Sequence, residues 1–186
     1  MIPGAVPEEL RERERWVCWK EEERNDQLTK IPKQPDGSGN AKSNDPDTWG
    51  AFEQAVETAE SRGQWGIGFV FTEDGPYTGI DLDDCLNGRS GPADWLPSLS
   101  PFLDVAYIER SPSGDGLHLI LRDVTIPEWW KNQHGKNDGR EIALFSDGRF
   151  FTFTGDSLDL SASEVGALDD DELRDWLLDA WDGFND

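Results

Sequence analysis

The segment Ile80-Asp81-Leu82-Asp83 constrains the fold of this chain more than any other. Successive side chains of a β-strand point to opposite faces, so Ile80 and Leu82 would face a core while Asp81 and Asp83 point together to the other face. Two like charges side by side on a strand are costly unless a cation lies between them. Hard divalent ions such as Mg²⁺ favour oxygen ligands of this kind, so the segment predicts a metal site. A chance pairing of two aspartates in an acidic chain is the alternative.

Other short apolar segments predict further strands, joined mainly as antiparallel pairs. They lie at 16–19, 29–32, 66–71, 77–82, 105–110, 117–122, 141–145 and 150–154. Turn residues predict hairpins around Asn25-Asp26, Glu73–Pro76 and Asp147-Gly148, the last being a strong two-residue turn signal. Residues 127–139 read as a polar loop, and a short helical stretch is expected near 95–103.

Two longer helices are expected. The first begins at Asp45-Pro46, with the Asp45 carboxylate as N-cap, and ends at Gly63. The second lies in the acidic tail, where Leu173, Trp176, Leu177, Ala180 and Trp181 recur at helical spacing. We interpret this tail, residues 161–186, as an amphipathic helix packed on an α+β domain that covers residues 1–160. A partner-binding helix is the alternative.

The chain is strongly acidic, with 39 acidic residues against 17 basic ones and a net charge of −22. Such self-repulsion weakens a compact state in dilute buffer, whereas concentrated salt screens it. We therefore interpret the acidity as adaptation to a salt-rich cytoplasm; an acidic nucleic-acid mimic or a partner-binding surface is the alternative. Residues 105–155 are nearly neutral, with six bases and seven acids, and they hold most of the motifs described below.

Cysteine content and hydropathy exclude several classes of protein. Cys18 and Cys85 are the only cysteines and form no CxxC pair, which argues against a zinc site or a disulfide framework. No apolar run approaches the length of a membrane span, and the N-terminus lacks a signal peptide's hydrophobic region. These features predict a cytoplasmic protein.

A second candidate motif is the segment from Ser111 to His118, with the sequence SPSGDGLH. Gly114 and Gly116 let backbone amides approach an anion closely, and Ser111 and Ser113 add hydroxyl donors. Leu117, Leu119 and Leu121 would face the core and leave His118 on the other face. An ordinary turn followed by a surface histidine is the alternative.

Three further residues are candidates for the same chemistry. Glu141 shares an alternating face with Ala143 and could complete a carboxylate trio with Asp81 and Asp83, although a surface glutamate is the alternative. Arg149 is a candidate for binding a triphosphate, and Lys30 is another. If Asp147-Gly148 forms a two-residue hairpin loop, however, Arg149 lies on the face opposite Glu141.

Together these motifs resemble the primase-polymerase branch of the archaeo-eukaryotic primases, particularly the phage- and plasmid-type replication proteins. The matching segments, in order, are Lys30–Pro32, Asp45–Trp49, Ile80–Asp83, Ser111–His118, Glu141 and Arg149–Gly155. The resemblance covers roughly residues 15–158. It implies an archaeo-eukaryotic primase-like catalytic core of mainly antiparallel sheets flanked by helices.

The resemblance also implies roles for the candidate residues. Asp81, Asp83 and Glu141 would hold Mg²⁺ or Mn²⁺ and act in catalysis with His118. His118 would bind the nucleotide triphosphate, together with Ser111, Ser113, Gly114 and Gly116, while Arg149 and Lys30 are further nucleotide-binding candidates. The partners would be nucleotide triphosphates, a single-stranded DNA template and a replicative helicase module. No association with a membrane is expected.

Two other functions stay open at this point. One is a non-catalytic nucleic-acid or protein interaction module that keeps the primase fold. The other is a different metalloenzyme that uses the paired aspartates, such as a nuclease. The presence of all three acids and His118 favours a nucleotidyltransferase.

Overall fold

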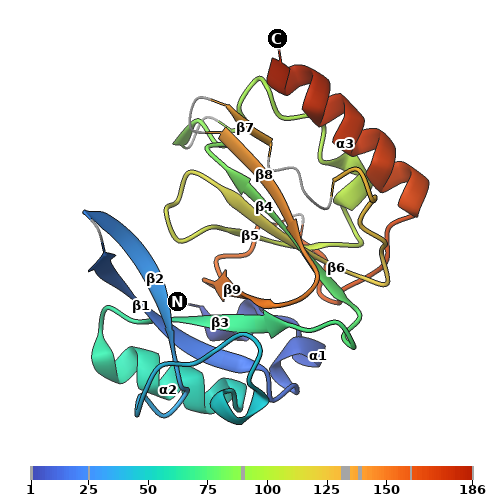
Figure 1. The fold of residues 1–186 in the computed structure, drawn as a ribbon. Helices are drawn as coiled ribbons and strands as arrows, with labels where there is room; N and C mark the ends of the chain where they lie inside the picture. The colour runs from blue at the N-terminus through green and yellow to red at the C-terminus, as the bar shows by residue number, and fades with distance from the viewer. Residues whose placement is uncertain are drawn as a thin grey trace. The chain divides into compact units, whose positions relative to one another are not determined.

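The computed structural model describes residues 2–24, 26–88, 91–130, 135–137, 140–159 and 161–185. The chain divides into two compact units: unit 1 comprises Met1–Gly75 and Asp147–Gly155, and unit 2 comprises Pro76–Ser146 and Asp156–Asp186. Each unit is built around its own antiparallel sheet (Figure 1). The prediction of an α+β fold with mainly antiparallel strands is confirmed.

Unit 1 is a four-stranded sheet in the order β2-β1-β3-β9. Its strands are β1 (Trp16–Arg24), β2 (Gln27–Lys33), β3 (Gly66–Phe71) and β9 (Arg149–Phe153). Helix α2 (Phe52–Arg62) lies along the sheet (Figure 1), and α1 (Glu8–Arg11), η1 (Pro3–Ala5) and η2 (Pro46–Thr48) are short. The fully buried Trp16 makes edge-to-face contacts with Phe52, Phe69 and Phe153, at centroid distances of 4.8, 5.2 and 5.1 Å. An aromatic cluster therefore forms the centre of this unit's core.

Unit 2 is a five-stranded sheet in the order β5-β6-β4-β8-β7. Its strands are β5 (Tyr107–Arg110), β6 (Leu117–Arg122), β4 (Tyr77–Asp83), β8 (Arg140–Phe145) and β7 (Gly135–Asn137). Helix α3 (Asp170–Asn185) covers one face of the sheet (Figure 1), and η4 (Ser100–Phe102) packs there too.

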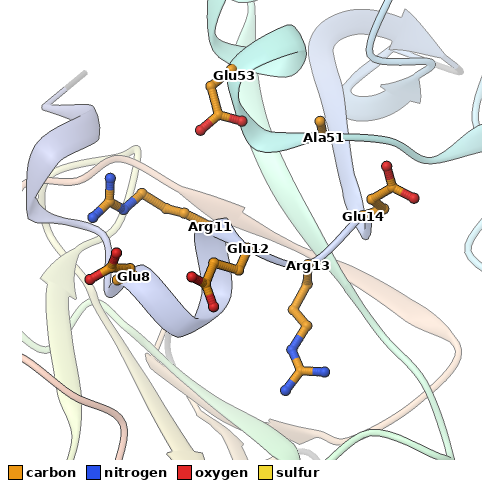
Figure 2. A pocket seen from close by; sticks show the side chains of 7 residues that line it. All are labelled: Glu8, Arg11, Glu12, Arg13, Glu14, Ala51 and Glu53. Atoms are coloured by element: carbon orange, nitrogen blue, oxygen red, sulfur yellow. The ribbon is translucent and has the colours of Figure 1, made fainter.

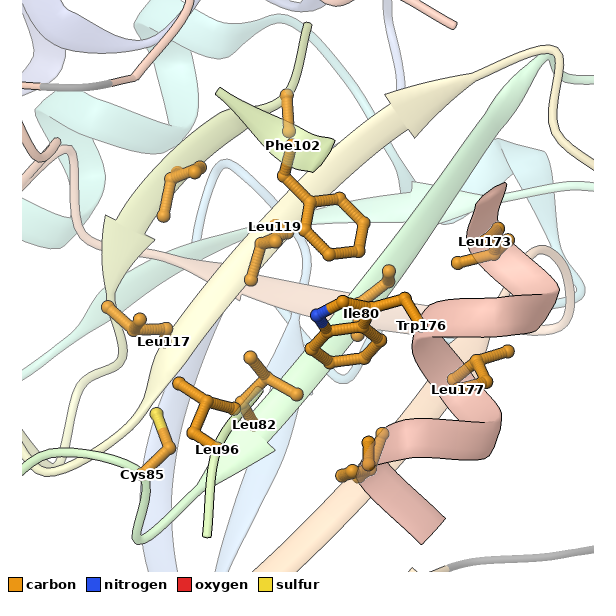
Figure 3. Packing of buried hydrophobic residues seen from close by; sticks show 14 of the residues in the cluster. Ile80, Leu82, Cys85, Leu96, Phe102, Leu117, Leu119, Leu173, Trp176 and Leu177 are labelled. Carbon is orange, nitrogen blue, oxygen red and sulfur yellow. The ribbon is translucent and has the colours of Figure 1, made fainter. Parts of the chain in front are cut away.

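The core of unit 2 lies between this sheet and α3. Ile80 and Leu82 of β4 lie in the buried cluster on the face that α3 covers, together with Leu117 and Leu119 of β6 (Figure 3). The facing side chains of α3 are buried: Leu173, Trp176, Leu177 and Ala180. Because strand side chains alternate, this packing leaves the odd-numbered residues of β4 on the other face.

Two predicted hairpins are wrong. Strand β3 pairs with β1 and β9 in unit 1, whereas β4 pairs with β6 and β8 in unit 2, so residues 66–82 form no hairpin. Strands β8 and β9 likewise belong to different sheets. Gly148 does adopt a turn conformation with φ of 61°, but a turn signal fixes only a local change of direction. Non-local burial selects the partner: β8 pairs with β4, which places Ile142 beside Leu82 in the core.

A helix does begin at Pro46 with Asp45 at its N-cap position, but the prediction of one long helix from there to Gly63 is wrong. Pro46 begins the 3-10 helix η2, and the Asp45 side chain makes no capping hydrogen bond. The Thr48 hydroxyl instead donates to the Asp45 carbonyl oxygen at 2.7 Å, and Trp49 then returns to extended backbone. Helix α2 therefore begins at Phe52, while its predicted end at Gly63, with φ of 77°, is confirmed.

Smaller differences concern the segments around 95–103 and 127–139. The helical stretch expected near 95–103 is limited to η4, and the expected loop at 127–139 contains β7. Residues 131–134 and 138–139 of that loop, and Asn25 of the first predicted turn, lie outside the described residues. Within the described ranges no helix is both long and apolar enough to cross a membrane.

We expect Trp176→Ala to lower the free energy of unfolding by about 3–5 kcal/mol, as for other buried large aromatic residues. Trp176 is 4% exposed, lies 4.9 Å from the Phe102 ring centroid, and donates its Nε1–H to the Ser98 carbonyl oxygen. Urea unfolding measures the change. The matched control is Leu178→Ala on the same helix, because Leu178 is 45% exposed and should change stability by about 0.5 kcal/mol or less. Equal losses in both variants would contradict the described packing of α3.

Candidate active site

The polar face of the five-stranded sheet collects the acidic residues that the sequence predicted. On β4, Asp81 lies opposite His118 of β6 and Ala143 of β8, and Asp83 lies opposite Glu141 of β8. Paired residues on adjacent antiparallel strands share a face. The register therefore brings Asp81, Asp83, Glu141 and His118 onto one face, the face opposite α3.

Strand β5 extends this row to a residue that the sequence analysis did not single out. Glu109 lies opposite His118. Its Oε1 lies 3.3 Å from Nδ1 of His118, and the other ring nitrogen, Nε2, lies 3.5 Å from Oδ1 of Asp81. Glu109 is fully buried and His118 is 3% exposed. The imidazole is thus held between two carboxyl groups in the interior of the protein.

Tyr107 completes this arrangement. Its hydroxyl donates a hydrogen bond to Oε2 of Glu109 at 2.8 Å. Burial raises the pKa of Tyr107 well above its ordinary value, and the neighbouring Glu109 raises it further. The phenol therefore keeps its proton and remains a donor to the carboxylate. The signal for these residues was present in the alternation Tyr107-Ile108-Glu109, but a single glutamate on a strand does not reveal its burial.

The turn between β5 and β6 closes one end of this row. The Ser111 N–H donates to the Gly116 carbonyl oxygen at 2.9 Å, and the Gly114 N–H donates to the Ser111 carbonyl oxygen at 3.0 Å. Gly114 has φ of 86°, which favours glycine. The hydroxyl oxygens of Ser111, which is buried, and Ser113, which is exposed, lie 2.9 Å apart. The predicted Ser-Gly motif is thus a compact turn with two adjacent hydroxyl groups.

Gly116 places this turn directly beside β4. A Cβ atom on Gly116 would lie 2.6 Å from the Leu82 carbonyl oxygen, 2.9 Å from Ser111 Oγ and 3.4 Å from Asp83 Oδ1. Only glycine allows so close an approach of the two backbones. The hydroxyl of Ser111 and the carboxylate of Asp83 are consequently neighbours.

The donor atoms on this face fit a hard divalent cation, because Asp81, Asp83 and Glu141 offer only carboxylate oxygens. Their side chains do not converge as they stand: among the described residues, no group of three or more His, Cys, Asp or Glu side chains is arranged to hold an ion. Mg²⁺ usually binds through one or two carboxylates and completes its coordination with water and substrate phosphates, so a closed protein cage is not required.

The two remaining candidates, Lys30 and Arg149, belong to unit 1. Lys30 is exposed on β2 with its Nζ 5.4 Å from the Trp19 ring centroid. Arg149 is exposed at the start of β9, opposite Phe71. Residues 141–154 do not form a hairpin, so the predicted placement of Arg149 on the face opposite Glu141 does not apply. The role of Lys30 and Arg149 in nucleotide binding stays a prediction.

Unit 1 contains a separate pocket of about 280 Å³, which none of the predicted site residues lines (Figure 2). Its lining consists of Glu8, Arg11, Glu12, Arg13, Glu14, Ala51 and Glu53. Four glutamates against two arginines make the lining net acidic, which disfavours a phosphate ligand. We therefore place no chemistry in this pocket.

The two cysteines have structural positions. Burial raises the pKa of the Cys18 thiol to about 11 and that of Cys85 to about 12. Both thiols are buried and free of disulfides. They therefore stay protonated near neutral pH and are poor nucleophiles and metal ligands.

The chain is 35% identical over 145 residues to the DNA primase-polymerase of Nitratiruptor phage NrS-1. The chain carries a domain related to a primase-polymerase. The matched segment covers 77% of this chain but only 19% of the phage protein, so the primase-polymerase-like domain corresponds to about a fifth of that relative's length. No family model matches the chain.

We expect Gly116→Ala to destabilise the primase-polymerase-like domain by about 1–3 kcal/mol, because the added methyl group overlaps the Leu82 carbonyl oxygen and forces the backbone to shift. Urea unfolding measures the loss. Gly4→Ala is the control, since a Cβ at Gly4 meets no atom within 4 Å. If the two variants are equally stable, β4 and the 111–116 turn do not approach each other as described.

Proposed function

We propose that this chain is a template-dependent nucleotidyltransferase, a DNA primase-polymerase domain that acts in phage- or plasmid-type DNA replication. The observation that carries the proposal is the polar row of unit 2, in which Asp81, Asp83 and Glu141 share a sheet face with His118. The similarity to a phage primase-polymerase supports the same reading. Nucleotidyl transfer depends mainly on positioning and electrostatic stabilisation, and carboxylates with a buried histidine supply both.

Asp81, Asp83 and Glu141 would hold Mg²⁺ or Mn²⁺ in this proposal. When bound, the ion would activate the attacking hydroxyl group and neutralise charge on the triphosphate. The pairing of Asp83 with Glu141 supports it, because like charges directly opposite each other on neighbouring strands are destabilising without a cation. A hydrated ion that also binds substrate phosphate needs few protein ligands.

The nucleotide triphosphate would bind next to the carboxylates. The hydroxyl groups of Ser111 and Ser113 would donate to its phosphate oxygens, and Gly114 and Gly116 keep the turn compact beside Asp83. His118 would contact the triphosphate and stabilise charge on the leaving pyrophosphate. Arg149 and Lys30 are further candidates for this role, with the charge that phosphate recognition requires.

The other partners follow from the proposed reaction. A primase-polymerase needs a single-stranded DNA template. A replicative helicase module stays a predicted partner. Replication of DNA in a phage- or plasmid-bearing cell takes place in the cytoplasm, so we propose that location.

The acidity of the chain fits a salt-rich cytoplasm. Exposed acidic clusters support this proposal: Asp169, Asp170, Asp171 and Glu172 follow one another at the start of α3, with Arg174 bonded to Asp171. Salt at molar concentration reduces the screening length to about 3 Å and removes most of the repulsion between such groups.

We expect the melting temperature to rise when NaCl or KCl is increased from about 0.1 M to several molar. The reason is the screening of a net charge of −22. Differential scanning calorimetry over a salt series measures the change. A melting temperature that is flat or falls with salt would contradict salt adaptation.

Primer extension tests the proposed activity. The wild-type chain, with Mn²⁺ or Mg²⁺ in high salt, should lengthen a labelled primer on a single-stranded template, and Asp81→Ala/Asp83→Ala should lose activity by a factor of about 10² or more, since the metal site contributes several kcal/mol. The matched control is Glu57→Ala/Glu60→Ala on the exposed side of α2, which changes the net charge by the same amount.

The outcomes separate the candidate functions. Template-directed lengthening that the control keeps and the double aspartate variant loses supports a polymerase. Shortening of the labelled strand under the same conditions would indicate a nuclease. No change in the strand, from a folded chain that binds DNA, would indicate an interaction module.

A further inference from the structure

A row of polar contacts lies behind the proposed active site: two hydrogen bonds followed by an ion-pair contact. It runs from the Tyr107 hydroxyl to Glu109, 2.8 Å away, from Glu109 to Nδ1 of His118, 3.3 Å away, and from Nε2 of His118 to Asp81, 3.5 Å away. The exposure of the side chains increases along it: Glu109 is 0% exposed, His118 is 4% exposed and Asp81 is 29% exposed. The row therefore leads from the interior to the face that carries the carboxylates.

The burial of Glu109 is unusual and calls for an explanation. A carboxylate removed from water is costly unless hydrogen bonds and a charge partner replace its hydration. Ile108 and Leu119, which neighbour this pair in register, show that apolar side chains fill the opposite face of the same strands. On its own face, Glu109 accepts a hydrogen bond on each carboxylate oxygen, one from the Tyr107 hydroxyl and one from Nδ1 of His118.

We propose that Glu109, anchored by Tyr107, is a positioning residue that fixes the imidazole of His118 for binding the nucleotide triphosphate. This inference rests on the proposed function, because it assigns His118 to that substrate. Glu109 itself does not touch the substrate.

The chemistry of histidine explains how one carboxylate can do this. A carboxylate only accepts hydrogen bonds, so the ring nitrogen that faces Glu109, Nδ1, must carry a proton. The partner of one ring nitrogen determines which nitrogen is presented to a ligand. Glu109 therefore turns Nε2 towards Asp81 and the polar face, and it prevents the ring from rotating away. Tyr107 keeps Glu109 in place from the other side.

The first test is kinetic. We expect Glu109→Ala to lower kcat/KM for the nucleotide by about tenfold or more, as is usual when the partner that orients a functional histidine is lost. Glu109→Gln, which keeps an acceptor oxygen, should recover most of this loss. Tyr107→Phe should also lower kcat/KM, but by a smaller factor than Glu109→Ala. If Glu109→Ala fails to fold, Tyr107→Phe tests the proposal in its place. Thr78→Val, a buried polar substitution on the opposite face of the same sheet, should leave kcat/KM near the wild-type value.

A double-mutant cycle separates positioning from general loss of stability. If Glu109 acts through His118, then Glu109→Ala should change kcat/KM by less than about twofold in a His118→Ala background, because contacting residues that act as a unit are not additive. Full additivity, or a Glu109→Ala variant as active as the wild type, overturns the proposal.

A spectroscopic test needs no catalytic activity. In the wild-type chain, ¹⁵N NMR should give a proton-bearing Nδ1 for His118, and Glu109→Ala should remove the partner that holds this proton and shift the Nδ1 signal. The chain has two histidines, so comparison with His134→Asn assigns the signals. Unchanged His118 signals in Glu109→Ala overturn the positioning even if the enzyme polymerises DNA. Changed signals in a chain that makes no primer-extension product leave the positioning supported and reject the polymerase instead.

Discussion

The alternation along β4 is the constraint on which the rest of unit 2 depends. Ile80 and Leu82 are fully buried against α3, and this packing fixes which face Asp81 and Asp83 occupy. A shift of the strand by one residue would exchange the two sets and bury both aspartates. The apolar packing of a helix against a sheet therefore sets the position of the charged face, and the energy that keeps the carboxylates on one face comes from the opposite side of the sheet.

The neighbouring strands turn this pair of aspartates into a site. Strand β8 adds Glu141, β6 adds His118, and β5 adds Glu109 with its partner Tyr107. The close approach of Gly116 to Leu82 brings the Ser111 hydroxyl next to Asp83. Such a face, with hydroxyl donors at one end and carboxylates in the middle, suits a triphosphate and a divalent ion. This is the basis on which we propose nucleotidyl transfer for a domain related to a phage primase-polymerase.

The sequence predicted local features well and long-range pairing poorly. Strand β6 and the end of α2 at Gly63 lie where the residues indicated, because turn and capping signals act within a few residues. The assignment of β3 and β9 to one sheet and of β4 and β8 to another was missed, since the Asp147-Gly148 signal specifies a turn and not a partner strand. The carboxylates and His118 were predictable from alternation and motif order. The role that we propose for Glu109 was not predictable, because its burial follows only from the register of β4, β5 and β6.

We propose that a divalent ion binds the polar face formed by β4, β6 and β8. NMR of the ¹⁵N-labelled chain titrated with substoichiometric Mn²⁺ in high salt tests it most directly, because the paramagnetic ion broadens the signals of nearby nuclei. We expect the amide signals of Asp81, Asp83, Gly116 and Glu141 to broaden first, and we expect Asp81→Ala/Asp83→Ala to remove this selectivity. Broadening that is uniform over the acidic surface, or strongest at the start of α3, would contradict it.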